Sequence, residues 1–156
     1  MRVILLAIGT RMPDWVEAGT AEYQKRLAGD IRLEVEEVAM PRRDGRPVAK
    51  LIQAEAEALE KRLGKYPGAS RVALEVTGRR LDTHGLSTRL GRLRDEGRDL
   101  VLLTGGPDGL CPALSRRCDE RWSLSDLTLP HPLVRILIAE QVYRGWSLLA
   151  GHPYHR

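Results

Sequence analysis

The residues best suited to bind a ligand directly follow a short apolar run, Leu100–Thr104. The run is rich in β-forming side chains and ends in a glycine-rich turn, G-G-P-D-G at 105–109. This pattern is typical of a buried strand whose backbone enters a tight turn. Because open α/β sheets hold their ligands at the carboxyl ends of strands, we expect a ligand site at this turn.

A second segment, Leu124–Leu129, is more apolar than an ordinary exposed loop. Pro130 and Pro132 keep it from running straight into a following helix. Such a loop offers main-chain N–H and C=O groups beside an apolar wall, which suits a flat neutral heterocycle such as adenine better than a phosphate. His131, between the two prolines, is the ionisable ring beside this segment.

The elements that must position these segments alternate between strands and helices. Apolar or alternating runs predict strands at 2–8, 32–38, 71–76, 100–104 and 122–124. Apolar residues at helical spacing predict helices at 14–27, 48–63, 86–93, 113–119 and 132–149.

Three of the predicted strands end within two residues of a glycine, at Gly9, Gly78 and Gly105. This is the pattern of parallel strands whose carboxyl ends share one rim, so we expect an α/β fold with a mostly parallel twisted sheet and helices on both faces. Strand 32–38 carries alternating charges and is expected at an edge. Helix 132–149 is apolar over more than one face and needs a partner besides the sheet, for which a second subunit is the simplest candidate.

The length and composition predict one globular domain over residues 1–156. Charged residues make up 29% and apolar residues 42% of the sequence, and the chain is long enough to bury a core without metal or disulfides. No apolar run is long enough to cross a bilayer, and the apolar start is too short for a signal peptide. We therefore expect a cytoplasmic protein with no membrane partner.

The net charge of +4 favours a polyanionic partner, although charge alone is weak evidence. Arginine pairs at 42–43, 79–80 and 116–117 suit phosphates and equally suit a solvated surface. The loop 41–47 (P-R-R-D-G-R-P) is either a simple connection or a mobile basic flap that contacts RNA phosphates. The sequence leaves both interpretations open.

Cys111 and Cys118 would lie about 10 Å apart on one helix, too far for a disulfide, so we expect both to be reduced and buried. Neither their spacing nor that of His152 and His155 matches a structural zinc site, so no metal site is expected. The P-loop, the G-x-G-x-x-G fingerprint and the G-x-S-x-G nucleophile motif are also missing from the sequence.

Five stretches carry a family resemblance. They are A-I-G-T-R-M-P-D-W-V at 7–16, G-G-P-D-G-L at 105–110, W-S-L-S-D-L-T-L-P-H-P-L-V-R at 122–135, A-E-Q-V-Y-R-G-W at 139–146 and H-P-Y-H-R at 152–156. Together they resemble the RlmH family, bacterial ribosomal RNA large-subunit methyltransferases of the SPOUT superfamily. The likeness covers essentially the whole chain and is loosest between residues 42 and 66.

The resemblance implies a SPOUT fold with a C-terminal trefoil knot, a homodimer, and S-adenosylmethionine as the cofactor. It further implies an enzyme that methylates ring nitrogen 3 of a pseudouridine in the 23S rRNA of the assembled ribosome. By motif, the cofactor contacts fall on Leu74, Gly105 and the segment 124–129. With the other turn glycines, the candidate cofactor-binding residues are Leu74, Gly105, Gly106, Gly109, Leu124, Ser125, Asp126, Leu127, Thr128 and Leu129.

A sulfonium methyl donor is already activated, so such an enzyme must mainly align donor and acceptor and help remove a proton from the attacking nitrogen. The candidate catalytic residues are His131, Arg144, Tyr154 and His155, of which the tail residues could reach a partner's pocket. The simpler alternatives are that His131 caps a helix, that Arg144 forms an ordinary ion pair and that the tail frays.

Two other functions fit the same residues. A non-catalytic, ribosome-associated RNA-binding module of this fold would bind RNA with a steep salt dependence and transfer no methyl group. An α/β enzyme that acts on a nucleotide or another small metabolite would turn over without RNA.

Overall fold

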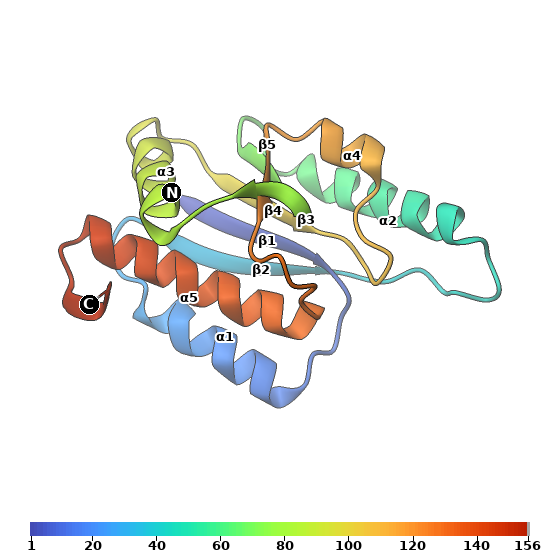
Figure 1. Cartoon of the computed structure of the whole chain (residues 1–156), viewed down its shortest axis with the longest axis horizontal. Helices are drawn as coiled ribbons and strands as arrows, with labels where there is room; N and C mark the ends of the chain where they lie inside the picture. Colours follow the sequence, from blue (N-terminus) through green and yellow to red (C-terminus); the bar gives the residue numbers. More distant parts are fainter. Residues whose placement is uncertain (156) are drawn as a thin grey trace.

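The computed structural model describes residues 1–155, and for His155 it describes the backbone alone. Strands and helices alternate along the described chain (Figure 1). The elements are β1 (Arg2–Ile8), α1 (Asp14–Arg26), β2 (Arg32–Val38), α2 (Val48–Leu63), β3 (Ser70–Arg80), α3 (Thr83–Asp95), β4 (Leu100–Thr104), α4 (Pro112–Arg116), β5 (Glu120–Ser123), α5 (His131–Leu149) and the 3₁₀ helix η1 (Pro153–His155).

The strands form one sheet in the order β2-β1-β4-β3-β5, and every neighbouring pair is parallel. The prediction of an α/β fold with a parallel sheet is therefore confirmed, and so is the edge position of strand 32–38. The trefoil knot stays a prediction, because strand order alone does not define how a chain threads through its own loops.

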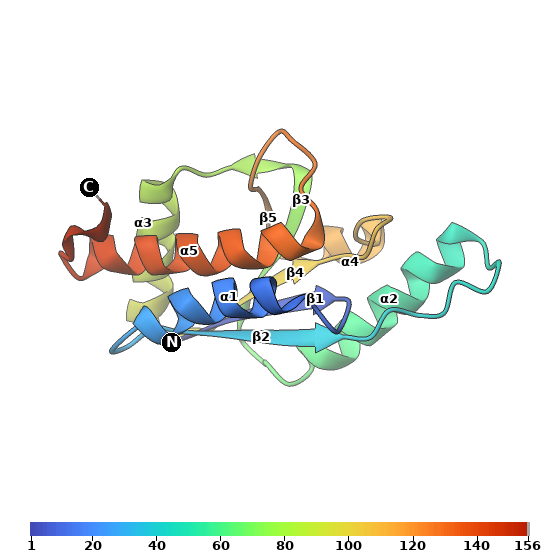
Figure 2. The ribbon, with the colours of Figure 1, turned by 90° about the horizontal axis from the view of Figure 1, so that it is seen from below.

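Helices cover both faces of the sheet, as predicted (Figure 2). Successive residues of a strand point to opposite faces, so the apolar run of β1 feeds two cores at once. Val3 and Leu5 pack with α1, α3 and α5, whereas Ile4 and Leu6 pack with α2 and α4. A strand buried on both faces needs a continuous apolar run, which is why no alternation is visible in β1 or β4.

This topology brings two chain segments together at the carboxyl edge. The segment after β4 leads into α4, and the segment after β5 leads into α5. Because β4 and β5 both flank β3 and run parallel to it, the two segments leave the sheet at the same end.

Strand β3 is longer than predicted. The sequence suggested an end at Thr77-Gly78, but β3 continues to Arg80, with a register shift against β5 between Leu74 and Arg79. A Cβ on Gly78 would lie 2.6 Å from the carbonyl carbon of Trp122, closer than real contacts allow. Gly78 therefore marks a close approach to β5 and not the end of a strand.

The region around the cysteines also differs from the prediction. Helix α4 spans only Pro112–Arg116, so Cys111 precedes it and Cys118 follows it instead of sharing one helix. Both cysteines are free, as expected, but they are half-buried and not fully buried. Asp82 caps α3 by accepting a 2.7 Å hydrogen bond from the Gly85 N–H, so this helix begins three residues earlier than expected.

Among the residues that the structure describes, no helix has the length and apolar character needed to cross a membrane.

Candidate functional site

A cavity of about 680 Å³ lies at the carboxyl ends of β3 and β4. Its walls are the turn after β4, the segment after β5 and the first turn of α5. Nine of the ten residues predicted to bind the cofactor line it: Leu74, Gly105, Gly106, Gly109, Leu124, Ser125, Leu127, Thr128 and Leu129. Segments from distant parts of the sequence therefore converge on one cavity.

The glycine turn owes its shape to close backbone packing. The Gly109 N–H donates a 3.0 Å hydrogen bond to the Gly106 carbonyl, which closes the turn around Pro107. A Cβ on Gly105 would lie 2.3 Å from the carbonyl carbon of Gly109, so no larger residue fits there without moving the turn.

A buried carboxylate that the sequence did not predict holds this turn in place. Glu55 of α2 is only 4% exposed, and its Oε2 accepts a 3.1 Å hydrogen bond from the Gly106 N–H. Burial raises the pKa of Glu55, against a smaller opposite effect of that hydrogen bond. Leu51, Glu55 and Leu59 share one face of α2, so a charged residue within an apolar stripe was the signal that could have found it.

The basic loop 41–47 reaches the same turn. Arg43 Nη2 lies 2.6 Å from Asp108 Oδ2, and this ion pair is the link between the loop and the turn after β4. The side chain of Arg43 is half exposed, so the pair contributes little to stability. The loop therefore contacts the turn at the edge of the cavity.

The apolar segment after β5 is shaped by its serines. Ser123 Oγ donates a 3.0 Å hydrogen bond to the Ser125 carbonyl, and Ser125 Oγ accepts one of 3.0 Å from the Leu127 N–H. Asp126 does not line the cavity: its carboxylate pairs with Arg80 at 2.6 Å and is largely exposed. This position differs from the expectation, because consecutive residues of a turn point in different directions.

His131 is the first residue of α5 and lines the cavity. Its Nδ1 lies 3.4 Å from Thr104 Oγ1 at the end of β4. Helix α5 has Pro130 at its N-cap and no side-chain hydrogen bond there, so His131 does not cap the helix. The imidazole therefore lies beside the start of a long helix, whose positive end faces the cavity.

The other catalytic candidates lie at the far end of α5. Arg144 is 13 residues beyond His131, about 20 Å along a helix. It forms an ion pair with Glu140 at 2.5 Å and stacks over the Tyr154 ring at 4.9 Å. The side chain of His155 lies outside the described part of the structure. One chain therefore does not bring Arg144 or Tyr154 close to His131.

Tyr154 is held in an aromatic cluster. Its ring centre lies 4.6 Å from that of Tyr143, and its hydroxyl donates a 3.3 Å hydrogen bond to Glu140. Burial, followed by a hydrogen bond with Tyr23, raises the pKa of Tyr154 to about 12. A phenol with this pKa is protonated at neutral pH, so Tyr154 could donate a hydrogen bond but would not act as a base.

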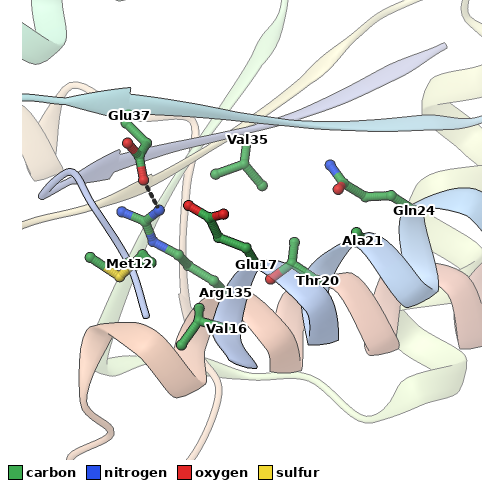
Figure 3. A pocket seen from close by; sticks show the side chains of 9 residues that line it. All are labelled: Met12, Val16, Glu17, Thr20, Ala21, Gln24, Val35, Glu37 and Arg135. Carbon is green, nitrogen blue, oxygen red and sulfur yellow. Dashed lines mark hydrogen bonds and ion pairs between the residues drawn. The ribbon is translucent and has the colours of Figure 1, made fainter. Parts of the chain in front are cut away.

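A second cavity of about 320 Å³ lies between α1 and β2 (Figure 3). Arg135 reaches across it from α5 and donates to Glu37 at 2.5 Å and to the Gly9 carbonyl at 2.7 Å. None of the predicted site residues lines this cavity. Arg135 and Glu37 pair with each other, and Arg135 joins α5 to the ends of β1 and β2.

No group of three or more histidine, cysteine, aspartate or glutamate side chains in the described residues is arranged to hold a metal ion.

Comparison with known proteins identifies the family. The family model described as "Predicted SPOUT methyltransferase" matches residues 1–155. The chain belongs to the SPOUT methyltransferase family. The resemblance stated from the motifs is therefore confirmed, and so is the prediction that the chain is a methyltransferase.

Two relatives of this SPOUT chain match over their whole length. A protein of Alcanivorax borkumensis named ribosomal RNA large subunit methyltransferase H is 64% identical, with all of both chains covered. A protein of the same name from Chromohalobacter salexigens is 53% identical, again with all of both chains covered.

Two solved structures share the fold at low sequence identity. One is a chain from Bordetella pertussis described as a probable methyltransferase, with a TM-score of 0.54 and 16% identity over 92% of this chain and 95% of that one. The other is a methylase family protein from Neisseria gonorrhoeae, with a TM-score of 0.53 and 13% identity over 91% of this chain and 80% of that one.

Proposed function

We propose that this SPOUT protein transfers a methyl group from S-adenosylmethionine to ring nitrogen 3 of a pseudouridine in the 23S rRNA of the large ribosomal subunit. The observation that carries the proposal is the cavity at the carboxyl edge, because its walls are the turn and the apolar segment expected to hold the cofactor. The names of the two relatives, and their similarity to this chain over its full length, support the choice of rRNA as substrate.

The residues around the cavity fit this cofactor. Lysine and arginine are missing from the lining residues that the structure describes, so the cavity suits an adenosyl group better than a phosphate. The serine-shaped segment 124–129 offers main-chain groups and leucine side chains to a flat ring. Bound S-adenosylmethionine supplies a methyl group that is already activated by the sulfonium.

The chain must then align the acceptor nitrogen and help it lose its proton. The positive end of α5 favours negative charge that develops on the uracil-type ring. His131 lies at that end and can accept the proton or donate a hydrogen bond to a ring oxygen.

We further propose that the enzyme works as a homodimer. Trp15 of α1 and Leu133 and Leu137 of α5 are large apolar side chains with 38% or more of their surface exposed. Their burial by a second copy would cover this apolar surface. A second copy would also supply Arg144 and Tyr154, which lie too far from His131 within one chain.

The RNA is expected to approach the same edge. The half-exposed Arg43 and its neighbours in loop 41–47 border the glycine turn and carry charge that suits phosphates. An rRNA substrate within the ribosome also implies that the enzyme acts in the cytoplasm.

Cofactor binding is the first test. Calorimetric titration of the full chain should give saturable binding of one S-adenosylmethionine per chain. Lack of binding by a correctly folded protein would overturn the proposal.

The reaction is tested by mass spectrometry of 23S rRNA from cells that lack the protein. The pseudouridine methyl group should be missing, return with the wild-type chain, and stay at least about a hundredfold lower with His131→Ala. Methylation that persists without the protein would contradict the function, and full rescue by His131→Ala would contradict only the role of His131.

A further inference from the structure

The cavity has an uneven charge distribution. Among its lining residues in the described chain, Glu75 carries the only formal negative charge and His131 is the only other ionisable group. Nearby acids face elsewhere: Asp108 pairs with Arg43, and Asp126 pairs with Arg80. Glu75 was not expected from the sequence, where it follows the predicted contact residue Leu74 inside an apolar strand.

Glu75 is held in place by a hydrogen bond and is only weakly paired with a cation. Ser115 of α4, itself 3% exposed, donates a 2.9 Å hydrogen bond to its Oε2. Arg121 approaches Oε1 only to 4.0 Å, and with 57% of its side chain exposed it neutralises the carboxylate weakly. The side chain of Glu75, 26% exposed, therefore holds a fixed negative charge beside the cavity that this residue lines.

We propose that Glu75 is a specificity-determining residue that makes the cavity prefer the positively charged sulfonium donor over the neutral thioether product. The proposal rests on the methyl transfer described under the proposed function. In that step the sulfur–methyl bond breaks and a nitrogen–methyl bond forms, the bonding pair returns to sulfur, and the proton on nitrogen leaves. The sulfonium becomes S-adenosylhomocysteine, a thioether without that positive charge.

A fixed carboxylate attracts only the donor form. Coulomb attraction between a fixed carboxylate and a sulfonium in a partly solvated cavity corresponds to roughly a tenfold difference in affinity. Since the attraction acts on the ground state and fades as the sulfonium loses its charge, it lowers the KM for the donor without raising kcat. The product leaves more easily for the same reason.

The competing role is purely structural, since Glu75 also anchors α4 through Ser115. Loss of a structural anchor would weaken all ligands of the cavity together. Loss of a charge would weaken only positively charged ligands, so the two roles give different results.

The experiment measures the dissociation constants of three ligands by calorimetry on the full chain. S-adenosylmethionine and sinefungin carry a positive charge at or near the sulfur position, and S-adenosylhomocysteine does not. Glu75→Gln keeps the shape of the side chain and an acceptor for Ser115. It should bind the two charged ligands about tenfold more weakly and the thioether within about twofold of wild type. The KM for the donor should rise while kcat should not fall.

Two further variants complete the test. Glu75→Asp keeps the charge and should retain most of the preference for the charged ligands. Glu34→Gln removes one negative charge from an exposed position on β2, which β1 and β4 separate from β3, and should leave all three affinities unchanged.

An equal loss for all three ligands in Glu75→Gln, or an unchanged ratio between donor and product, overturns the inference. If the wild-type chain binds none of the three ligands, the proposed function fails together with the inference. Wild-type binding with an unchanged ratio in Glu75→Gln leaves the proposed function standing and removes only the role of Glu75.

Discussion

Two carboxylates near the cavity illustrate how neighbours decide what a residue does. Glu55 is buried behind the glycine turn and accepts the Gly106 N–H, whereas Glu75 lines the cavity and is fixed by Ser115. The first positions backbone that a cofactor would contact, and the second holds a negative charge beside the cavity. Neither role follows from the residue type alone.

The buried position of Glu55 predicts a pH dependence of stability. Because burial raises its pKa in the folded chain, the native state holds this proton more tightly than the unfolded state does. The contribution of Glu55 to the free energy of unfolding therefore falls as the pH rises from its ordinary pKa of 4.5 through the raised folded value. Glu55→Gln cannot titrate and lacks this decline.

Urea unfolding of both proteins between about pH 4.5 and pH 7 measures the effect. The free energy of unfolding of the wild type minus that of Glu55→Gln should decrease with rising pH. A difference that stays constant or increases would show that Glu55 is not a carboxylate with a raised pKa.

At the scale of elements, the glycine turn is the part least tolerant of change. Gly105→Ala places a Cβ within 2.3 Å of the Gly109 carbonyl carbon, so the turn must move away from its present position. We expect a loss of about 1–3 kcal/mol in the free energy of unfolding and at least about tenfold weaker binding of S-adenosylmethionine.

Gly64→Ala is a matched control for this substitution. Gly64 follows α2 with ordinary helical angles, and a Cβ there would contact its surroundings at 3.4 Å. It should change the free energy of unfolding by less than about 0.5 kcal/mol. Similar effects of the two substitutions in urea unfolding and calorimetry would contradict the importance of the turn.

Helix α5 depends on a buried arginine at its first turns. Arg135 joins this helix to Glu37 of β2 (Figure 3). It also donates a hydrogen bond to the Gly9 carbonyl after β1. Arg135→Met should lower the free energy of unfolding by about 2–4 kcal/mol, because two acceptors lose their buried donor.

The exposed Arg92 is the control, since it pairs with Glu96 only one helical turn away. Arg92→Met should cost less than about 0.5 kcal/mol in the same urea unfolding experiment. A cost for Arg135→Met as small as this one would mean that α5 is held by its apolar contacts alone.

At the scale of the whole molecule, His131 and Arg144 of the same chain lie about two-thirds of the length of α5 apart, roughly 20 Å. If the proposed homodimer builds each site from His131 of one chain and Arg144 of the other, two inactive variants can complement each other. A mixed dimer of His131→Ala and Arg144→Ala contains one site with both residues intact.

Equal amounts of the two variants, unfolded and refolded together, should recover about a quarter of the wild-type methyl transfer, because about half of the dimers are mixed and each has one of two sites. The variants refolded separately are the control and should stay inactive. No recovery in a sample shown by sedimentation to contain dimers would contradict a shared site.

The sequence by itself determined which segments form strands and which two segments form the walls of the cavity. Continuous apolar runs such as Leu100–Thr104 predict strands buried on both faces, and the turn glycines and the segment 124–129 have local patterns that tertiary contacts did not override. The family motifs lie in these same segments. Local sequence is informative here because turn geometry and strand burial depend on neighbouring residues.

Only the tertiary structure decided which distant residues serve the cavity. Glu55 meets Gly106 across 51 positions of sequence, Gly78 accommodates β5, and Asp126 turns outward to Arg80. The distance from His131 to Arg144 likewise became meaningful only once both were placed on one straight helix. Such pairings arise when elements pack together, and no local periodicity or turn pattern encodes them.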